Sequence, residues 1–247
     1  MRWRITTLKE VSSTQTAARV LAESGSAEGT VVVAEAQTEG WGRRGRRWYS
    51  PPGGLYMTAV LRPRNGAGLI PLMAGVAVAE TVRTTAGVEA ELKWPNDILI
   101  GGRKVGGILA ESAWSGKEAV YALLGIGVNL NNRLPPVLHE ATTLSAETGR
   151  EIDPQRFLAV LLEKLDQGLR LLETEPGRVL EAWRRLSSTL GHRVEVVVES
   201  GEAVRVVAVD IDPDGALVLE IGDGRRRVVS GSLRETLLLS SEADRLI

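Results

Sequence analysis

Four arginines crowd into a glycine-rich stretch of the sequence, at Arg43, Arg44, Arg46 and Arg47. A guanidinium group matches the oxygens of a phosphate or a carboxylate with two parallel hydrogen bonds. The surrounding residues 37–54 show neither helical nor strand periodicity, and loops of this length in compact domains usually carry function or lack order. The stretch therefore predicts an anion-binding loop, with a solvated basic turn or a short nucleic-acid contact as the alternatives.

A second candidate site lies in residues 93–111, where two glycines at 101–102 predict the turn of a β-hairpin. With that turn, Asp97 faces Gly106 and becomes the diagonal neighbour of Lys104, with α-carbons roughly 7–8 Å apart. The two side chains can then hold one ligand between them. The alternative is an ordinary surface ion pair, which contributes about 0–1 kcal/mol to stability.

Glycines in and beside this hairpin would let another group approach bare backbone. Gly106 and Gly107 lie in the hairpin itself, and the apolar segment 119–130 contains a Gly-x-Gly sequence that ends at Asn129. The side-chain amide of Asn129 could hydrogen-bond to a ligand at that point. Strand packing explains the same glycines equally well, so both interpretations stay open.

The rest of the pattern predicts the elements that must position these residues. Helical periodicity and capping residues predict helices, and apolar runs between turn residues predict buried strands. The helices are predicted at residues 12–24, 70–85, 154–172 and 176–188, and the strands at residues 30–36, 55–61 and 119–130. Short alternating segments at 194–198, 204–210, 216–221 and 226–230 predict a small antiparallel barrel or sandwich. We therefore expect an α+β protein with two domains, residues 1–188 and residues 189–247.

Composition argues against several classes of protein. The 247 residues carry a net charge of -1, unlike a general nucleic-acid or membrane-surface protein. Because the sequence has no cysteine and two histidines, disulfides and thiol catalysis are excluded and a His-rich metal centre has little to use. We find neither the apolar run of a signal peptide nor an uncharged apolar stretch long enough to span a bilayer. We therefore expect a cytoplasmic protein with no membrane partner.

Five motifs in this order resemble those of the biotin–protein ligases. They are Ser13-Thr14-Gln15, Gln37 with the stretch Gly40–Trp48, Lys93–Asp97, Lys104–Ile108 and Gly125–Asn129. The resemblance extends over essentially the whole chain. It implies a mixed β-sheet flanked by helices, related to the catalytic core of class II aminoacyl-tRNA synthetases, and an SH3-like C-terminal domain.

The resemblance also implies a reaction in two steps. The carboxylate of biotin attacks the α-phosphate of Mg-ATP, which gives biotinyl-5'-AMP and pyrophosphate. The amine of one lysine on a biotin carrier domain, usually that of acetyl-CoA carboxylase, then displaces AMP. Fixed cations suit this chemistry, because the first step brings two anions together.

Roles for individual residues follow from the same resemblance. The implied catalytic residues are Lys104, Arg43 and Asp97, and Asp97 is also the candidate ligand for Mg²⁺ or the proton acceptor for the incoming lysine. The implied biotin-binding residues are Ser13, Thr14, Gln15, Gln37, Gly40, Trp41, Gly42, Arg43, Lys104, Gly106 and Gly107. The implied ATP-binding residues are Arg44, Arg46, Trp48, Lys93, Asn96, Lys104 and Asn129.

One residue departs from the family pattern. Where the family usually has Gly-Arg-Gly-Arg, this sequence has Gly40, Trp41, Gly42 and Arg43, so tryptophan replaces an arginine that normally lies against biotin. An indole can still cover apolar ligand surface, but one cation near the carboxylate is lost. We expect weaker biotin affinity or faster loss of the adenylate, without a change of reaction.

Partners and rival functions complete the expectations. Some family members carry an N-terminal helix-turn-helix domain, and because only twelve residues precede Ser13 we expect no DNA binding. Relatives often dimerise through sheet edges, so a homodimer stays open. A lipoate–protein ligase is the nearest rival, and a single-stranded nucleic-acid-binding protein is the rival from another class. The polar residues Ser13–Gln15 and Gln37 favour the ureido ring of biotin over an apolar dithiolane.

Overall fold

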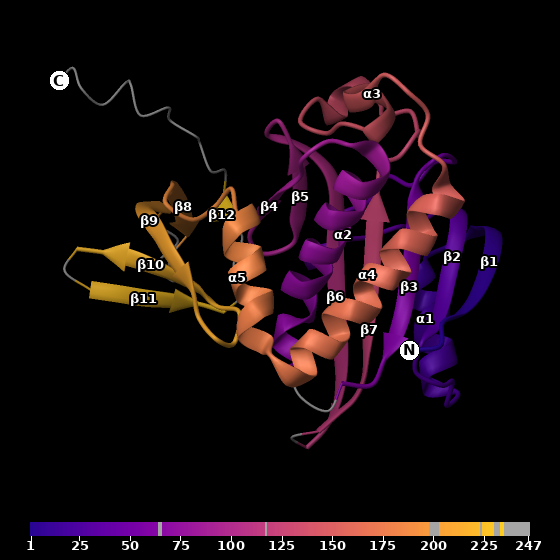
Figure 1. Ribbon diagram of the computed structural model, residues 1–247, viewed down its shortest axis with the longest axis horizontal. Helices are drawn as coiled ribbons and strands as arrows, with labels where there is room; N and C mark the ends of the chain where they lie inside the picture. Colours follow the sequence, from indigo (N-terminus) through magenta and orange to yellow (C-terminus); the bar gives the residue numbers. More distant parts are fainter. Residues whose placement is uncertain (64–65, 117, 198–202, 223, 230–232, 235–247) are drawn as a thin grey trace.

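The computed structural model describes residues 1–63, 66–116, 118–197, 203–222, 224–229 and 233–234, which form two β-sheets flanked by helices (Figure 1). The larger sheet has the order β1-β2-β3-β7-β6-β5-β4. Its strands are β1 (Arg4–Val11), β2 (Thr30–Gln37), β3 (Leu55–Leu61), β4 (Glu91–Lys93), β5 (Asp97–Ile100), β6 (Arg103–Ser115) and β7 (Glu118–Val128). β1 and β2 run parallel and the other neighbours run antiparallel, so the sheet is mixed.

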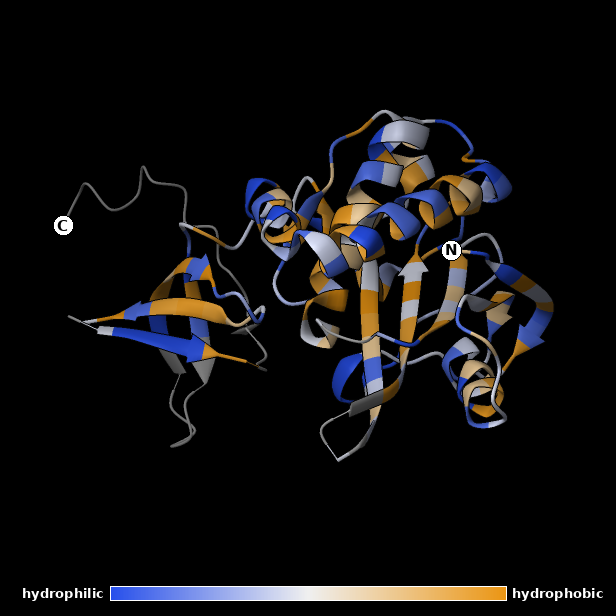
Figure 2. Ribbon diagram, turned by 60° about the horizontal axis from the view of Figure 1, so that its bottom comes forward, coloured by the Kyte–Doolittle hydropathy of each residue, from blue (hydrophilic) through white to orange (hydrophobic). Residues whose placement is uncertain are grey.

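Helices cover both faces of this sheet (Figure 2). One face carries α2 (Ile70–Ala86), α4 (Pro154–Thr174) and α5 (Pro176–Leu186), whose apolar side chains join the main core. The other face carries α1 (Thr14–Glu23), where Ala18 and Ala22 pack in a second cluster with Val32, Val60 and Leu123. Neighbouring strand residues therefore contribute to opposite clusters, as the alternation of side chains along a strand requires. The short helices are η1 (Arg43–Gly45), η2 (Ala67–Leu69), η3 (Pro136–Leu138) and α3 (Leu144–Thr148).

The segment Ala67–Ala86 is long and apolar enough to cross a membrane by length and composition alone. Most of it is buried inside the protein, and α2 contacts α4, α5 and the large sheet. The apolar character of this segment is that of a core helix, because its side chains form the centre of the main hydrophobic cluster.

The predicted helices and strands of the first 188 residues are present, with ends that differ by a few residues. Several elements were not predicted, among them the strands β1 and β4, the helix α3 and the short helices η1, η2 and η3. The strand β1 has mostly exposed side chains at the sheet edge, so its sequence lacks the apolar alternation that marks a half-buried strand. The five-residue helix α3, which Thr143 caps, is shorter than the period on which sequence patterns rest.

The β5–β6 hairpin turns at the two glycines of residues 101–102, as predicted, but its register differs. A bulge makes Asp97 pair with Gly107, so the expectation that Asp97 faces Gly106 is wrong by one residue. The extra residue in β6 is Val105, whose carbonyl accepts a hydrogen bond from the backbone N–H of Asn129. A bulge inserts one unpaired residue without changing the turn, and residue spacing alone does not reveal it.

The second sheet is antiparallel and has the order β11-β10-β9-β8-β12. Its strands are β8 (Arg193–Val197), β9 (Ala203–Ile211), β10 (Leu217–Ile221), β11 (Gly224–Val228) and β12 (Leu233–Arg234). The predicted fold class, a large mixed sheet with helices followed by a small antiparallel sheet, is confirmed. The division into domains at residues 188 and 189 stays a prediction. Two of the predicted strands were expected to end at Val198 and Ser230, and these residues, like 235–247, lie outside the described residues.

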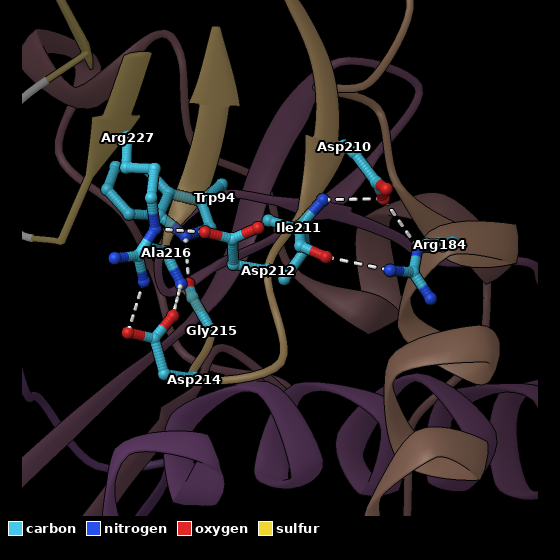
Figure 3. Close-up of polar contacts among 9 residues, drawn as sticks. All are labelled: Trp94, Arg184, Asp210, Ile211, Asp212, Asp214, Gly215, Ala216 and Arg227. Atoms are coloured by element: carbon cyan, nitrogen blue, oxygen red, sulfur yellow. Dashed lines mark hydrogen bonds and ion pairs between the residues drawn. The ribbon is translucent and has the colours of Figure 1, made fainter. Parts of the chain in front are cut away.

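Polar contacts join the second sheet to the first part of the chain (Figure 3). The indole N–H of Trp94, which follows β4, donates to the carbonyl of Gly215 in the β9–β10 turn at 3.1 Å. The guanidinium of Arg184 in α5 contacts the carboxylate of Asp210 and the carbonyl of Ile211, both at 2.7 Å. The backbone N–H of Trp94 also donates to the buried hydroxyl of Thr189 at 2.9 Å. The second sheet thus contacts the loop after β4 and stabilises its position.

Candidate functional site

A cavity of about 500 Å³ opens over the middle of the large sheet and is lined by three parts of the chain. The first is the N-terminus of α1 with the end of β2 and the middle of β3, and the second is the arginine loop, residues 41–49. The third is the β4–β5 turn with β6, β7 and residues 134–141. The two segments that the sequence selected for their charge, the arginine loop and the hairpin, thus lie on one cavity.

A neutral hydrogen-bond network forms the first wall. Oε1 of Gln37 accepts from the backbone N–H of Thr14 at 2.8 Å and from its hydroxyl at 3.1 Å. Nε2 of Gln37 donates to the hydroxyl oxygen of Ser50 at 2.9 Å, and that hydroxyl donates to the carbonyl of Trp48 at 3.1 Å. Ser13 caps α1 by accepting from the N–H of Gln15 at 3.2 Å. These contacts fix the orientations of buried or half-buried polar groups before any ligand binds.

The arginine loop is folded onto itself. Trp41 and Arg47 form an antiparallel bridge, and the N–H of Gly42 donates to the carbonyl of Arg46 at 2.7 Å. Within the turn, Arg44 has φ of 60°, in the left-handed region that non-glycine residues seldom adopt. The predicted irregular loop is therefore a closed turn. Its backbone hydrogen bonds fix the positions of the Cα atoms from which the arginine side chains extend.

Arg43 points from this loop to the β4–β5 turn, where its guanidinium donates to Oδ1 of Asn96 at 3.5 Å. Burial lowers the pKa of Arg43 from its ordinary value, and the positive charge of Arg44 lowers it further. Both effects disfavour the charged form, so an anion in this place would relieve them. The Arg43 side chain is charged and positioned beside the hairpin.

Lys104 lies at the same place from the other side. Its Nζ is 2.5 Å from Oδ1 of Asp97, which confirms that these residues are brought together. The backbone of Lys104 is fixed too, because its N–H donates to the carbonyl of Glu140 and its carbonyl accepts from Thr142, each at 2.8 Å. Since Asp97 directly follows Asn96, the partners of Lys104 and Arg43 are neighbours in the chain.

The indole of Trp48 lies beside the side chain of Lys104 and against the glycines of the neighbouring strands. Nζ of Lys104 lies 5.3 Å from the centroid of the Trp48 ring, which is the range of a cation–π contact. A Cβ at Gly127 would be 2.6 Å from Nε1 of Trp48, and one at Gly107 would be 3.2 Å from its ring. The glycines of the Gly125–Asn129 motif therefore make room for protein side chains, with Gly125 doing the same for Gln15.

Asn96 and Asn129 are tied into the structure around the cavity. Nδ2 of Asn96 donates to the carbonyl of Ile108 at 2.9 Å. Nδ2 of the buried Asn129 donates to the carbonyl of Thr142 at 3.1 Å, and its Oδ1 accepts from Asn132 at 3.2 Å. Lys93, at the end of β4, also lines the cavity.

The sequence of this chain is similar to those of two protein families and of several characterised proteins. Residues 8–129 match the model of the biotin/lipoate A/B protein ligase family, and residues 189–232 match that of the biotin protein ligase C-terminal domain. The bifunctional ligase/repressor BirA of Bacillus subtilis is 35% identical over 234 residues, which are 90% of this chain and 71% of that protein. The biotin–[acetyl-CoA-carboxylase] ligase of Mycobacterium tuberculosis is 35% identical over 82% of this chain and 77% of its own length.

The chain belongs to the biotin–protein ligase family. A solved structure agrees, since the biotin protein ligase of Aquifex aeolicus in complex with biotin and ATP is similar with a TM-score of 0.77 and 31% sequence identity. The match covers 92% of this chain and 96% of that one. The resemblance inferred from five short motifs is thereby confirmed, including the small C-terminal sheet.

In this member of the family, most of the residues predicted for the site line the single cavity described above. They are Ser13, Thr14, Gln15, Gln37, Trp41, Gly42, Arg43, Arg44, Arg46, Trp48, Lys93, Asn96, Asp97, Lys104, Gly107 and Asn129. Gly40 and Gly106 are buried behind the wall instead. A Cβ at Gly40 would be 2.6 Å from the hydroxyl of Ser50, and one at Gly106 would be 3.1 Å from the carbonyl of Gly127, so both glycines serve the packing of the wall.

Sequence reasoning missed Thr58, which lines the cavity, and Glu111, which contacts the cavity residue Gln15 from outside the lining. Thr58 in β3 donates its hydroxyl hydrogen to Thr14 or Gln15, at 2.9 Å and 3.0 Å. Glu111 in β6 accepts from Nε2 of Gln15 at 2.7 Å. Neither residue belongs to a motif, and both lie more than 40 positions from their partners, so no local signal marks them.

Proposed function

We propose that the chain is a biotin–protein ligase that activates biotin with ATP and transfers it to a lysine of a biotin carrier protein. The observation that supports this most is the asymmetry of the cavity. One end carries the neutral network of Ser13, Thr14, Gln15 and Gln37, and the other end carries the cationic groups of the arginine loop and Lys104. Such a cavity suits a ligand with a neutral polar ring at one end and a carboxylate at the other.

The neutral end would hold the ureido ring of biotin. Placed hydrogen-bond donors and acceptors give strong selectivity there, because a ligand without matching groups leaves buried polar atoms unpaired. The proposed contacts come from Ser13, Thr14, Gln15 and Gln37. The walls proposed for the apolar part of biotin come from Gly40, Trp41, Gly42, Gly106 and Gly107, although Gly40 and Gly106 would act through the shape of the wall.

The cationic end would carry the first reaction. A carboxylate oxygen of biotin attacks the α-phosphorus of ATP, the bond from that phosphorus to the bridging oxygen breaks, and pyrophosphate leaves with the electron pair. Lys104 and Arg43 would hold the carboxylate and α-phosphate together, because each anion repels the other until fixed cations offset their charge. Lys104 would exchange its ion pair with Asp97 for the reacting anions.

The nucleotide would lie along the arginine loop and the β4–β5 turn. Arg44 and Arg46 would bind phosphate oxygens, and Trp48, Lys93 and Asn96 would line the rest of the nucleotide site. Asn129 would act by positioning this side of the cavity, because both ends of its side-chain amide already hydrogen-bond to Thr142 and Asn132.

A magnesium ion fits the site as a companion of the nucleotide. Among the residues that the structure describes, no cluster of three or more carboxylate or histidine ligands exists, but Asp97 presents one carboxylate beside the cations. Magnesium in nucleotide sites is usually bound by one or two carboxylates together with phosphate oxygens. Asp97 would supply the protein ligand, and the bound ion would offset phosphate charge.

The second step would join biotin to its partner, a carrier domain such as that of acetyl-CoA carboxylase. The neutral amine of the acceptor lysine attacks the acyl carbon of biotinyl-5'-AMP, the bond to the phosphate oxygen breaks, and AMP leaves as an amide forms. Asp97 could accept the proton that the amine loses. The names of the relatives from Paracoccus denitrificans and Mycobacterium tuberculosis, biotin–[acetyl-CoA-carboxylase] ligases, support this partner.

The alternatives are less well supported. A lipoate–protein ligase would use the same adenylate chemistry, but its apolar dithiolane could not form hydrogen bonds with the polar groups of Gln15 and Gln37. A single-stranded nucleic-acid-binding protein would present all four arginines outward. Arg44, Arg46 and Arg47 are exposed, but Arg43 is half-buried and contacts Asn96 inside the cavity. The absence of DNA binding, the homodimer and the cytoplasmic location stay predictions.

The proposal is tested by mixing the protein with biotin and Mg-ATP and measuring biotinyl-5'-AMP by mass spectrometry and pyrophosphate release by a coupled assay. We expect adenylate from the unaltered chain and a rate at least about 100-fold lower from Lys104→Ala, since one fixed charge at the reacting phosphate is removed. Lys9→Ala, on the exposed edge strand β1, is the matched control and should keep full activity. Absence of adenylate from the unaltered chain would contradict the proposed function.

A further inference from the structure

The side-chain amide of Gln15 lies between two groups of opposite hydrogen-bonding character. Its Nε2 donates to Oε2 of Glu111 at 2.7 Å, and its Oε1 lies 3.0 Å from the donating hydroxyl of Thr58. An ionised carboxylate has no hydrogen to donate, so the end of Gln15 that faces Glu111 must be the nitrogen. Glu111 therefore decides which end of the amide is directed toward Thr58.

Two further residues support the same orientation. Arg19, one turn after Gln15 on α1, donates to the same Oε2 of Glu111 at 2.9 Å and so holds the carboxylate in place. On the opposite side, a Cβ at Gly125 would lie 2.6 Å from Oε1 of Gln15, so the glycine leaves space for that oxygen. Residues from helix α1 and from strands β3, β6 and β7 thus surround the side-chain amide of Gln15 and favour the same orientation of it.

The ion pair itself explains little of this arrangement. The side chains of Arg19 and Glu111 are 40% and 37% exposed, and ion pairs at this exposure contribute little to stability. Gln15, in contrast, is 3% exposed and lines the cavity. The main role of Glu111 is therefore to orient the buried side-chain amide of Gln15.

We propose that Glu111 is a positioning residue that sets the hydrogen-bond polarity of the neutral end of the cavity, and through it the selectivity for a ring with both N–H donors and a carbonyl acceptor. The inference rests on the proposed function, which places the ureido ring of biotin at this end. A flipped Gln15 presents a donor where the native amide presents an acceptor, so the ring loses a hydrogen bond and meets a like group. The cationic end should change little, because Lys104 contacts Asp97 and Trp48, and Arg43 contacts Asn96, rather than Glu111.

Variants that change polarity separately from charge pairing test this inference. In Glu111→Gln, Arg19 still selects the amide oxygen, so the orientation of Gln15 is retained. The double variants Glu111→Met/Arg19→Met and Glu111→Lys/Arg19→Met both lack the ion pair. They differ because the lysine ammonium donates hydrogen bonds and accepts none, so it favours the oxygen end of the Gln15 amide, whereas methionine favours neither end. Glu23→Gln is the matched control, since Glu23 lies on the same helix and contacts the hydroxyl of Tyr121 instead.

The dissociation constant of biotin is measured by calorimetry without ATP, together with KM for ATP and the thermal midpoint. We expect Glu111→Gln and Glu23→Gln to stay within about threefold of the unaltered chain, and the lysine double variant to bind biotin at least about tenfold more weakly than the methionine one. KM for ATP should change by less than about twofold in all of them. If the lysine variant does not fold, the single variants Glu111→Gln and Glu111→Met serve, with weaker binding expected for methionine alone.

Equal biotin affinities in the methionine and lysine double variants would overturn the inference, because those proteins differ only in the polarity that faces Gln15. An equal loss of affinity for biotin and ATP would overturn it as well. If the unaltered chain binds no biotin, the proposed function itself fails. Normal binding by the unaltered chain with equal variants would contradict only the role of Glu111.

Discussion

At the scale of single residues, cations that repel one another are held in one place by a carboxylate, an amide and an aromatic ring. Arg43 contacts Asn96, and Lys104 lies between the carboxylate of Asp97 and the face of Trp48. Each cation thus has a protein partner that holds it in place beside the cavity. The arrangement keeps the charges in position without neutralising them fully, which is what electrostatic stabilisation of a developing charge requires.

Trp41 gives a prediction at this scale, since it lines the cavity beside Arg43 where the family usually has arginine. In Trp41→Arg, we expect the dissociation constant of biotin to fall about tenfold, because a charge-assisted hydrogen bond to the carboxylate is added. Calorimetry measures it, and Trp114→Arg, at an exposed position outside the cavity, is the control. Unchanged affinity would contradict the expected cost of the tryptophan.

Gly127 gives a second residue-scale prediction. An added Cβ would lie 2.6 Å from Nε1 of Trp48, so Gly127→Ala must displace the indole that supports Lys104. Overpacking of this kind costs about 1–3 kcal/mol, and we expect kcat/KM for ATP to fall about tenfold or more. The matched control is Gly177→Ala in α5, where nothing lies within 4 Å of the added Cβ. Full activity of both variants would show that the position of Trp48 is not important.

At the scale of elements, helices that do not line the cavity stabilise the fold by packing in the main core. The helix α4 starts at Pro154, and the side chain of Asp153 caps it by accepting from the N–H groups of Gln155 and Arg156 at 2.9 Å and 3.3 Å. Its apolar stripe from Phe157 to Leu172 packs on α2 in the main core. The contribution of α4 is therefore to stability.

Removal of that cap tests the separation of stability from activity. In Asp153→Ala, we expect a loss of about 1 kcal/mol, which lowers the thermal midpoint by about 2–4 °C in a protein of this size. Asp153→Asn keeps an acceptor for the helix N–H groups and should retain most of the stability. KM for biotin and ATP should not change, and a changed KM would mean that α4 acts on the cavity.

At the scale of the whole molecule, the second sheet supports the loop that carries the nucleotide side of the cavity. Trp94 hydrogen-bonds through its indole to Gly215 (Figure 3). Its backbone N–H donates to Thr189, and Trp94 is flanked in the chain by Lys93 and, beyond Pro95, by Asn96. A shift of the second sheet would therefore move one wall of the cavity. The opposite wall, at the N-terminus of α1, has no such connection among the contacts described.

The connection predicts an effect on one substrate only. Trp94→Phe keeps the buried ring but removes the hydrogen bond to Gly215, so we expect KM for ATP to rise about three- to tenfold and KM for biotin to change by less than about twofold. Steady-state kinetics with each substrate varied in turn provide the measurement. Trp114→Phe, on a side chain 58% exposed at the far end of β6, is the control. Equal increases in both constants would argue for general loosening of the fold.

Local sequence patterns were sufficient to predict most helices and strands and the chemical types of residue in the site. A helix begins near Ser13, residues 55–61 form a buried strand, and two glycines turn the hairpin, because each of these depends on neighbours a few positions away. The tertiary structure alone decided the bulge at Val105, the edge pairing of β1, and the contact of Glu111 with Gln15, 96 positions away. Those features depend on which strands and helices come together, and the free energy of such long-range contacts leaves no local pattern in the chain.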